Sequence, residues 1–294
     1  MNMAREPSSA AVDVHTDPGR IQDRRWTFSE ALGRYGPWLL TVVNLAAFFC
    51  IWELVTRAGL VNPLFLPRAS AMFETLWHGL TTTAPAGAVI SGSILDHVLY
   101  TLRDLSIGLG IACAIGIPAG LLMGGNRYFE TAFSPYVWAF SSLPRIALVP
   151  LFILFLGFTM KMQITIIVLS AVFPIVINSW AGVKTTEKSL LAAARVFGAS
   201  RRDLYVKVVL PYTLPFIVSG IQQGIGRGLV AAIIAEIFGG SQGLGYLIQR
   251  SADTFDSALM YAVLLVLVAI SLTLVQLTRW LEAYVAPWRR AEML

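Results

Sequence analysis

The chain has 294 residues, of which 56% are hydrophobic and only 13% are charged, about half the roughly 25% of an ordinary globular domain. A mean hydropathy of +0.68 excludes a soluble enzyme as the default interpretation. The net charge of +5 would suit nucleic-acid binding, but the basic residues lie mainly beside apolar runs, where orientation in a membrane explains them.

The N-terminal region, residues 1–35, is polar and lacks an apolar run, so we expect it to form a disordered tail. Its Arg24-Arg25 pair resembles a twin-arginine signal, but the apolar run begins only at Pro37 and is long enough to span a bilayer. We therefore expect an uncleaved first transmembrane helix within residues 36–61, followed by a connection over residues 62–95.

Six segments are long enough to cross roughly 30 Å of hydrocarbon at about 1.5 Å per residue. Their expected limits are Pro37–Thr56, His97–Met123, Phe133–Leu156, Met162–Gly182, Leu210–Ile237 and Ala258–Trp280. The sequence thus predicts an all-α membrane protein with six transmembrane helices. The last five belong to one domain over residues 96–285, and residues 286–294 form a short tail.

The basic residues of the short loops predict the orientation of these helices, because Lys and Arg accumulate on the cytoplasmic side. With six spans, the three basic segments lie on one side of the membrane: the N-terminal tail, the connection between spans four and five, and the C-terminus. We therefore expect both termini and that connection to be cytoplasmic, and the protein to be a multi-pass protein of the bacterial inner membrane.

Two spans carry patterns that predict local packing. In the second span, Ala112, Gly116, Gly120 and Gly124 recur every four residues and share one helix face, where small residues allow another helix to approach closely. The third span contains the run LPRIALVP, whose two prolines remove backbone hydrogen bonds and favour a kink. Such a kink is compatible with a helix beside a solute pathway or with a purely structural bend.

The connection between spans four and five, Lys184 to Leu210, is too cationic to be buried in lipid. Thr186 can cap a first short helix, and Gly198 supplies the left-handed residue that often ends one. Ser200 then begins a second helix in a sequence that resembles a capping box with Asp203 in place of glutamate. The expected product is a rigid, bent pair of amphipathic helices. Its residues alone leave docking to a partner protein and contact with membrane lipid equally open.

The run AAARVFGASRRDLYVKVVLP resembles the EAA loop of permease subunits of type I ATP-binding-cassette (ABC) importers, whose pattern is Glu-Ala-Ala, three residues, Gly, nine residues, Ile, any residue, Leu-Pro. The residues that match this pattern are Ala193, Ala194, Gly198, Leu210 and Pro211. Two positions depart from it, since Ala192 replaces the glutamate and Val208 replaces the isoleucine. The runs LPRIALVPLFILFLG, FPIVINSW and AEIFGGSQGLGYLI are more specifically similar to the nitrate, sulfonate and taurine branch.

The resemblance implies a type I importer permease fold whose coupling helix, between spans four and five, docks on an ATPase subunit. The residues implied in that docking are Ala193, Ala194, Gly198, Ser200, Arg201, Leu210 and Pro211. It further implies two ATPase subunits, which bind ATP and Mg²⁺, a second permease copy, and an extracytoplasmic solute-binding protein. This chain would bind no cofactor or nucleic acid, and would conduct a small solute by alternating access.

Ionisable residues inside spans are costly enough to be candidates for function. Together with the prolines and one amide of the spans, the candidates for the pathway or its gating are Pro144, Arg145, Pro150, Asn178, Arg227 and Glu236. If the solute is an oxyanion, Arg145 can attract it. Structural ion pairing and snorkelling to lipid headgroups explain such charges equally well.

Other motifs give no sign of chemistry in this chain. The glycines of GGSQGLGY indicate a tight external turn, since no GxxxxGK[ST] phosphate-binding sequence occurs. The three histidines have no metal-ligand spacing, and no catalytic triad is recognisable. The rival interpretation is a secondary transporter driven by an ion gradient, but we find no internal repeat across the six spans of the kind such proteins often contain.

Overall fold

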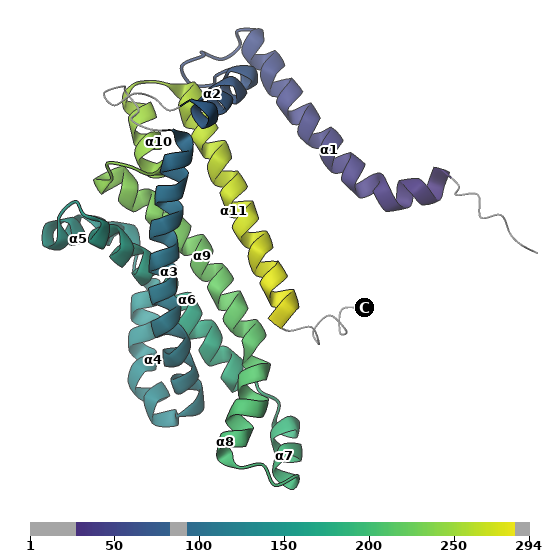
Figure 1. Ribbon diagram of the computed structural model, residues 1–294, viewed down its shortest axis with the longest axis vertical. Coiled ribbons are helices and arrows are strands. Elements are labelled where there is room, and N and C mark those ends of the chain that lie inside the picture. The colour runs from purple at the N-terminus through teal and green to yellow at the C-terminus, as the bar shows by residue number, and fades with distance from the viewer. Residues whose placement is uncertain (1–27, 83–92, 286–294) are drawn as a thin grey trace, which may run out of the picture. The chain divides into compact units, whose positions relative to one another are not determined.

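The computed structural model describes residues 28–82 and 93–285, and all its regular elements in these ranges are helices (Figure 1). Most of the N-terminal tail predicted for residues 1–35, and the whole tail predicted for residues 286–294, lie outside the described residues. The first helix, α1 (Phe28–Arg57), begins inside the range predicted for the N-terminal tail, because polar residues before the apolar run continue its helical turns.

The chain divides into a unit that ends at Ile51 and a unit that begins at Trp52. The first unit contains most of α1, whose stretch Leu39–Arg57 is apolar and long enough to span a membrane. In the second unit, the end of this helix is tied to the following connection. The indole of Trp52 donates a hydrogen bond to Pro67 O at 3.0 Å, and Glu53 accepts hydrogen bonds from the backbone and hydroxyl of Ser70.

The remaining elements follow in chain order. They are α2 (Ala69–Thr81), α3 (Ile94–Gly125), α4 (Arg127–Ser142), η1 (Arg145–Leu148), α5 (Val149–Leu156), α6 (Met160–Lys184), α7 (Lys188–Val196), α8 (Arg201–Leu204), the π-helical turn η2 (Tyr205–Val209), α9 (Leu210–Gly239), α10 (Leu244–Asp253) and α11 (Ser257–Val285). Among the described residues, five helices are long and apolar enough to cross a membrane, and the bent pair α4 and α5 makes a sixth if it is counted as one span. Five of the six predicted spans are thus confirmed as single long helices.

The third predicted span is broken rather than merely kinked. Helices α4 and α5, with η1 between them, form an angle of 88° at the break. Pro144 has extended backbone angles and caps η1, while Pro150 lies in the first turn of α5, where a missing N–H costs no helical hydrogen bond. The two prolines therefore define the end of one half-span and the start of the other.

Helix α6 is the centre of the second unit, with α3 on one side and α9 on the other (Figure 1). The side chains of Ala171 and Ile175 on α6 are fully buried, as is Ala112 on α3. The predicted stripe of small residues on α3 is confirmed as a packing surface, because Gly116, Gly120 and Gly124 all lie against α6.

We expect Gly120→Ala to lower the free energy of unfolding by about 1–3 kcal/mol, because an added methyl group would overpack the contact between α3 and α6. A Cβ at this position would lie 2.5 Å from Val176 O and 2.6 Å from Ser179 Cβ. Gly110→Ala is the matched control, since nothing lies within 4 Å of its Cβ position and alanine favours a helix. Thermal unfolding in detergent measures both variants, and equal midpoints would contradict the close contact.

The outward faces of the long helices are apolar, as expected where helices contact lipid. On α11, Leu264, Val268 and Leu272 follow one another at four-residue spacing, and all three side chains are exposed. The connections contain two helices that the sequence analysis did not predict, α2 and α10. Between α9 and α10 the expected turn is present, with Gly243 in a left-handed conformation at φ 106°.

Candidate functional site

The first candidate site is the bend between α7 and α8, which is built as predicted around Gly198. Helix α7 ends in a Schellman motif, in which Ala199 N–H donates to Ala194 O at 3.0 Å and Gly198 N–H donates to Arg195 O at 2.9 Å. This geometry requires a left-handed residue, and Gly198 has φ 80°. The predicted helix terminator is therefore confirmed.

The predicted caps of these two helices had different outcomes. Ser200 caps α8, since its hydroxyl accepts a hydrogen bond from Asp203 N–H at 3.2 Å and donates to the Asp203 carboxylate at 2.5 Å. The predicted cap at Thr186 is wrong, because Glu187 occupies the N-cap position of α7. The Thr186 hydroxyl instead donates back to Gly182 O at the end of α6.

The tip of this bend presents an unusual combination of side chains to its surroundings. Val196 and Phe197 are 85% and 89% exposed, and Arg195, Arg201 and Arg202 beside them are also exposed. Ala193 is exposed too, whereas Ala194 is half-buried. An exposed aromatic side chain among cations, held on a rigid turn, is suited to insertion into a groove of a protein partner.

The bend is joined to the long helices by chain continuity and by side-chain contacts near it. Helix α8 passes through the π-helical turn η2 into α9, which carries Leu210 and Pro211 in its first turn. The hydroxyl of Tyr205 in this turn donates to Leu121 O on α3 at 2.9 Å. Lys184, just before the bend, forms an ion pair with Glu130 on α4 at 2.5 Å. The bend is therefore continuous with α9 and is followed by a contact with α3, while the end of α6 that precedes α7 contacts α4.

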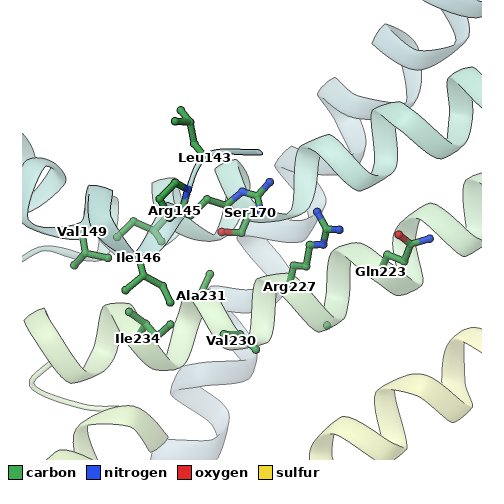
Figure 2. A pocket seen from close by; sticks show the side chains of 13 residues that line it. Leu143, Arg145, Ile146, Val149, Ser170, Gln223, Arg227, Val230, Ala231 and Ile234 are labelled. Carbon is green, nitrogen blue, oxygen red and sulfur yellow. The ribbon is translucent and has the colours of Figure 1, made fainter. Parts of the chain in front are cut away.

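The second candidate site is a cavity of about 600 Å³ between the broken third span, α6 and α9 (Figure 2). The break contributes Pro144 and Arg145, and α9 contributes Gln223 and Arg227. Ser170 on α6 adds one hydroxyl. Most of the other lining side chains are apolar, and none of the described residues that line the cavity is acidic.

Neighbouring residues hold the Arg145 side chain in place, and no acidic side chain among the described residues forms an ion pair with it. Its Nη2 donates to Ser141 O at 2.9 Å, and its guanidinium carbon lies 5.8 Å from the centre of the Phe173 ring. Its Nε is buried and has no hydrogen-bond partner among the residues that the structure describes. Part of the donor capacity of this guanidinium thus remains unused.

Arg227 supplies a second cation to the same cavity. Its side chain is exposed, and within the described part of the chain it makes no hydrogen bond or ion pair. The charges of Arg145 and Arg227 interact electrostatically, and Figure 2 shows the two side chains reaching from η1 and from α9 into the same region. Two like charges near one another, without an acid between them, favour an anion in the cavity.

The other predicted pathway residues lie outside the cavity lining. Asn178 is one contact away, since its amide donates to Pro174 O at 2.8 Å and its Oδ1 accepts from Gln223 at 3.4 Å. Pro150 follows the lining residue Val149 at the start of α5 and does not itself line the cavity.

Glu236 belongs to a separate buried cluster at the other end of α9 from the bend. Its carboxylate accepts hydrogen bonds from the Thr101 hydroxyl and from Gly245 N–H, both at 2.8 Å. Leu244 N–H donates to the Thr101 hydroxyl at 3.0 Å, and Gly243 N–H donates to His97 Nδ1 at 2.9 Å. The cluster ties the turn before α10 to α3, and it does not bring Glu236 to Arg227.

Ser170 and Gln223 also line the cavity and were not predicted, although α9 contains a signal for the second. Gln223, Arg227, Val230 and Ile234 recur at helical spacing and form the stripe of α9 that faces the cavity. No comparable pattern distinguishes Ser170, because it becomes a lining residue only through the packing of α6 against the broken span.

The chain matches a family model described as "Binding-protein-dependent transport system inner membrane component" over residues 116–291. It is 32% identical to a putative ABC transporter permease protein of Methanocaldococcus jannaschii, over 82% of this chain and 88% of the relative. It is 28% identical to the taurine transport system permease protein TauC of Escherichia coli strain K12, over 90% of this chain and 92% of the relative. A putative aliphatic sulfonates transport permease protein, SsuC of Bacillus subtilis strain 168, is 26% identical over 97% of this chain and 95% of its own length.

A likeness to a solved structure extends the comparison to the fold. A chain of the MetNI methionine ABC transporter, in an inward facing conformation, matches with a TM-score of 0.58. The match covers 65% of this chain and 95% of that chain at 21% sequence identity. At this identity the likeness shows the fold alone, and it agrees with the arrangement of long helices described above.

Proposed function

This chain belongs to the inner membrane components of binding-protein-dependent transport systems, and we propose that it moves its solute by docking an ATPase through the bend between α7 and α8. As a member of this family it is the membrane-spanning permease subunit of an ABC importer, and the secondary-transporter interpretation is not favoured. The observation that carries the proposal is the Schellman turn at Gly198, which presents Phe197 outward and continues into α9.

The proposed mechanism is alternating access driven from outside this chain. Closure of two ATPase subunits around ATP and Mg²⁺ displaces the bend, and the continuous path from α8 through η2 into α9 carries the displacement to the cavity wall. The ion pair between Lys184 and Glu130 carries part of it to α4, which ends at the break beside Arg145. This chain would bind no nucleotide or cofactor and would supply passage and movement.

The proposed assembly follows the family to which the chain belongs. A second copy of this permease, two ATPase subunits and an extracytoplasmic binding protein would complete the importer, with membrane lipid around the apolar outer faces. Both termini and the bend would face the cytoplasm, as the basic residues of the loops predict. The names of the relatives, for taurine and for aliphatic sulfonates, support a small organic sulfonate as the solute.

Uptake into proteoliposomes tests this function. The chain is reconstituted together with its ATPase and binding protein, and uptake of a labelled alkanesulfonate is measured with and without ATP inside. We expect uptake only when ATP is present on the side of the ATPase. Uptake by this chain alone, driven by an ion gradient without ATP, would overturn the proposal and restore the secondary transporter.

A further inference from the structure

We propose that the cavity between η1 and α9 binds an amphipathic organic anion, with the anionic group between Arg145 and Arg227 and the alkyl part on the apolar wall. The inference rests on the proposed function in one respect, namely that the cavity lies on the route of the solute. It goes further by assigning the recognition of the charged group to two named side chains and by specifying which chemical group the cavity rejects.

The charged groups that line the cavity are two arginines. The guanidinium groups of Arg145 and Arg227 repel one another, and no acidic residue among the described lining residues offsets them. Arginine presents a planar fork of donors that matches the oxygens of a sulfonate or carboxylate. A single anion placed between the two groups would offset the repulsion and use donors without a partner in the described part of the chain, such as the buried Nε of Arg145.

The two arginines belong to different structural elements. Arg145 begins η1 at the break of the third span, whereas Arg227 lies in the middle of α9, which continues from the bend. An anion bound by both would therefore connect the broken span to the helix that the bend displaces. Binding and release of the anion would then depend on the relative positions of these two elements.

The apolar wall of the cavity distinguishes an organic anion from a small inorganic one. Ile146 and Val149 line the cavity from the broken span, Ile166 from α6, and Val230 and Ile234 from α9. Contact of an alkyl chain with this wall gains about 0.8 kcal/mol per buried methylene, which corresponds to about fourfold in affinity. Nitrate and sulfate carry no group that could make this contact.

A cationic group on the ligand would find no acidic side chain among the described residues that line the cavity. Taurine has an ammonium group two carbons from its sulfonate, and in this cavity the ammonium would meet two arginines and no described acidic side chain. Ethanesulfonate is the same molecule without the ammonium. The cavity should therefore bind ethanesulfonate more tightly than taurine, although relatives of this chain are named for both types of sulfonate.

Calorimetric titration tests this anion site. The full chain is used in complex with its ATPase in lipid nanodiscs, without the binding protein. We expect ethanesulfonate to bind at least about tenfold more tightly than taurine, and each methylene up to butanesulfonate to add about fourfold. Arg145→Gln and Arg227→Gln should each weaken butanesulfonate binding by about tenfold to a hundredfold. Arg279→Gln is the matched control, because Arg279 is an exposed arginine of α11 outside the cavity.

Two results would overturn the inference: equal affinity for taurine and ethanesulfonate, or wild-type affinity for butanesulfonate in both cavity variants. The outcome is separable from that of the proposed function. ATP-driven uptake with unchanged affinity in the cavity variants would refute the anion site alone. Arginine-dependent binding of butanesulfonate, without any ATP-driven uptake, would support the site and refute the proposed importer function.

Discussion

Gly198→Val is expected to weaken docking of the ATPase by about thirtyfold and to abolish ATP-driven uptake, while the transmembrane helices remain folded. Gly198 has φ 80°, and a side chain in this left-handed conformation costs about 2 kcal/mol, which corresponds to the thirtyfold change. No atom lies within 4 Å of its Cβ position, so the expected effect comes from the backbone and not from a clash. The measurement is co-purification of the ATPase with the tagged permease, followed by the uptake assay.

The matched control for this prediction is Gly59→Val. Gly59 also has a left-handed backbone, at φ 69°, and also has open space at its Cβ position, but it follows α1 and is remote in sequence from the bend. It should show the same local strain with normal ATPase docking. Normal docking of the Gly198 variant would contradict the role assigned to the bend.

A separate variant, Ala192→Glu, restores the motif residue on an exposed position of α7. It should change docking of the ATPase only modestly.

Glu236→Ala is expected to lower the free energy of unfolding by about 3 kcal/mol and to impair transport. Glu236 is 1% exposed, and its removal leaves the N–H of Gly245 and the hydroxyl of Thr101 without their acceptor. The turn before α10 would keep only the hydrogen bonds of Gly243 N–H to His97 and of Leu244 N–H to Thr101 as its attachment to α3. Thermal unfolding in detergent measures the loss, and Glu74→Ala on an exposed face of α2 is the control that should leave stability unchanged.

The variant Glu236→Gln separates a structural role from the pathway role predicted for this residue. A glutamine can still accept from Gly245 N–H and donate to the Thr101 hydroxyl, so it should retain most of the stability and transport. If transport is lost while the unfolding temperature stays near that of the wild type, Glu236 acts on the solute and its role in holding the turn is secondary.

Local sequence patterns predicted the elements that depend on local physics. The long apolar runs predicted five single spans within a few residues, because hydrocarbon thickness fixes their length. The position of Gly198 predicted the end of α7, since a left-handed residue is needed there whatever surrounds it. The capping role predicted for Thr186 was wrong because the same hydroxyl can also bond to the preceding turn of α6, and the local pattern does not distinguish the two.

The broken third span shows the limit of such patterns. Its two prolines predicted a distortion, but a proline inside an apolar run is compatible with both a kink and a break. The prolines Pro118 and Pro174 lie inside α3 and α6, which continue as single helices. Pro144 and Pro150 instead lie at helix ends, since Pro144 has an extended backbone before η1 and Pro150 is in the first turn of α5.

The sequence by itself determined that this chain lies in a membrane, where five of its six spans lie, and which cationic connection bends at Gly198, because burial in lipid and backbone conformation act on neighbouring residues. Only the tertiary structure decided which intramembrane charges meet. It brought Arg145 and Arg227 into one cavity and placed Glu236 apart, in contact with Thr101 and Gly245. The physical reason is that these contacts depend on how α3, α6 and α9 pack across the chain, and hydrophobic periodicity specifies which face of a helix is buried but not which partner covers it.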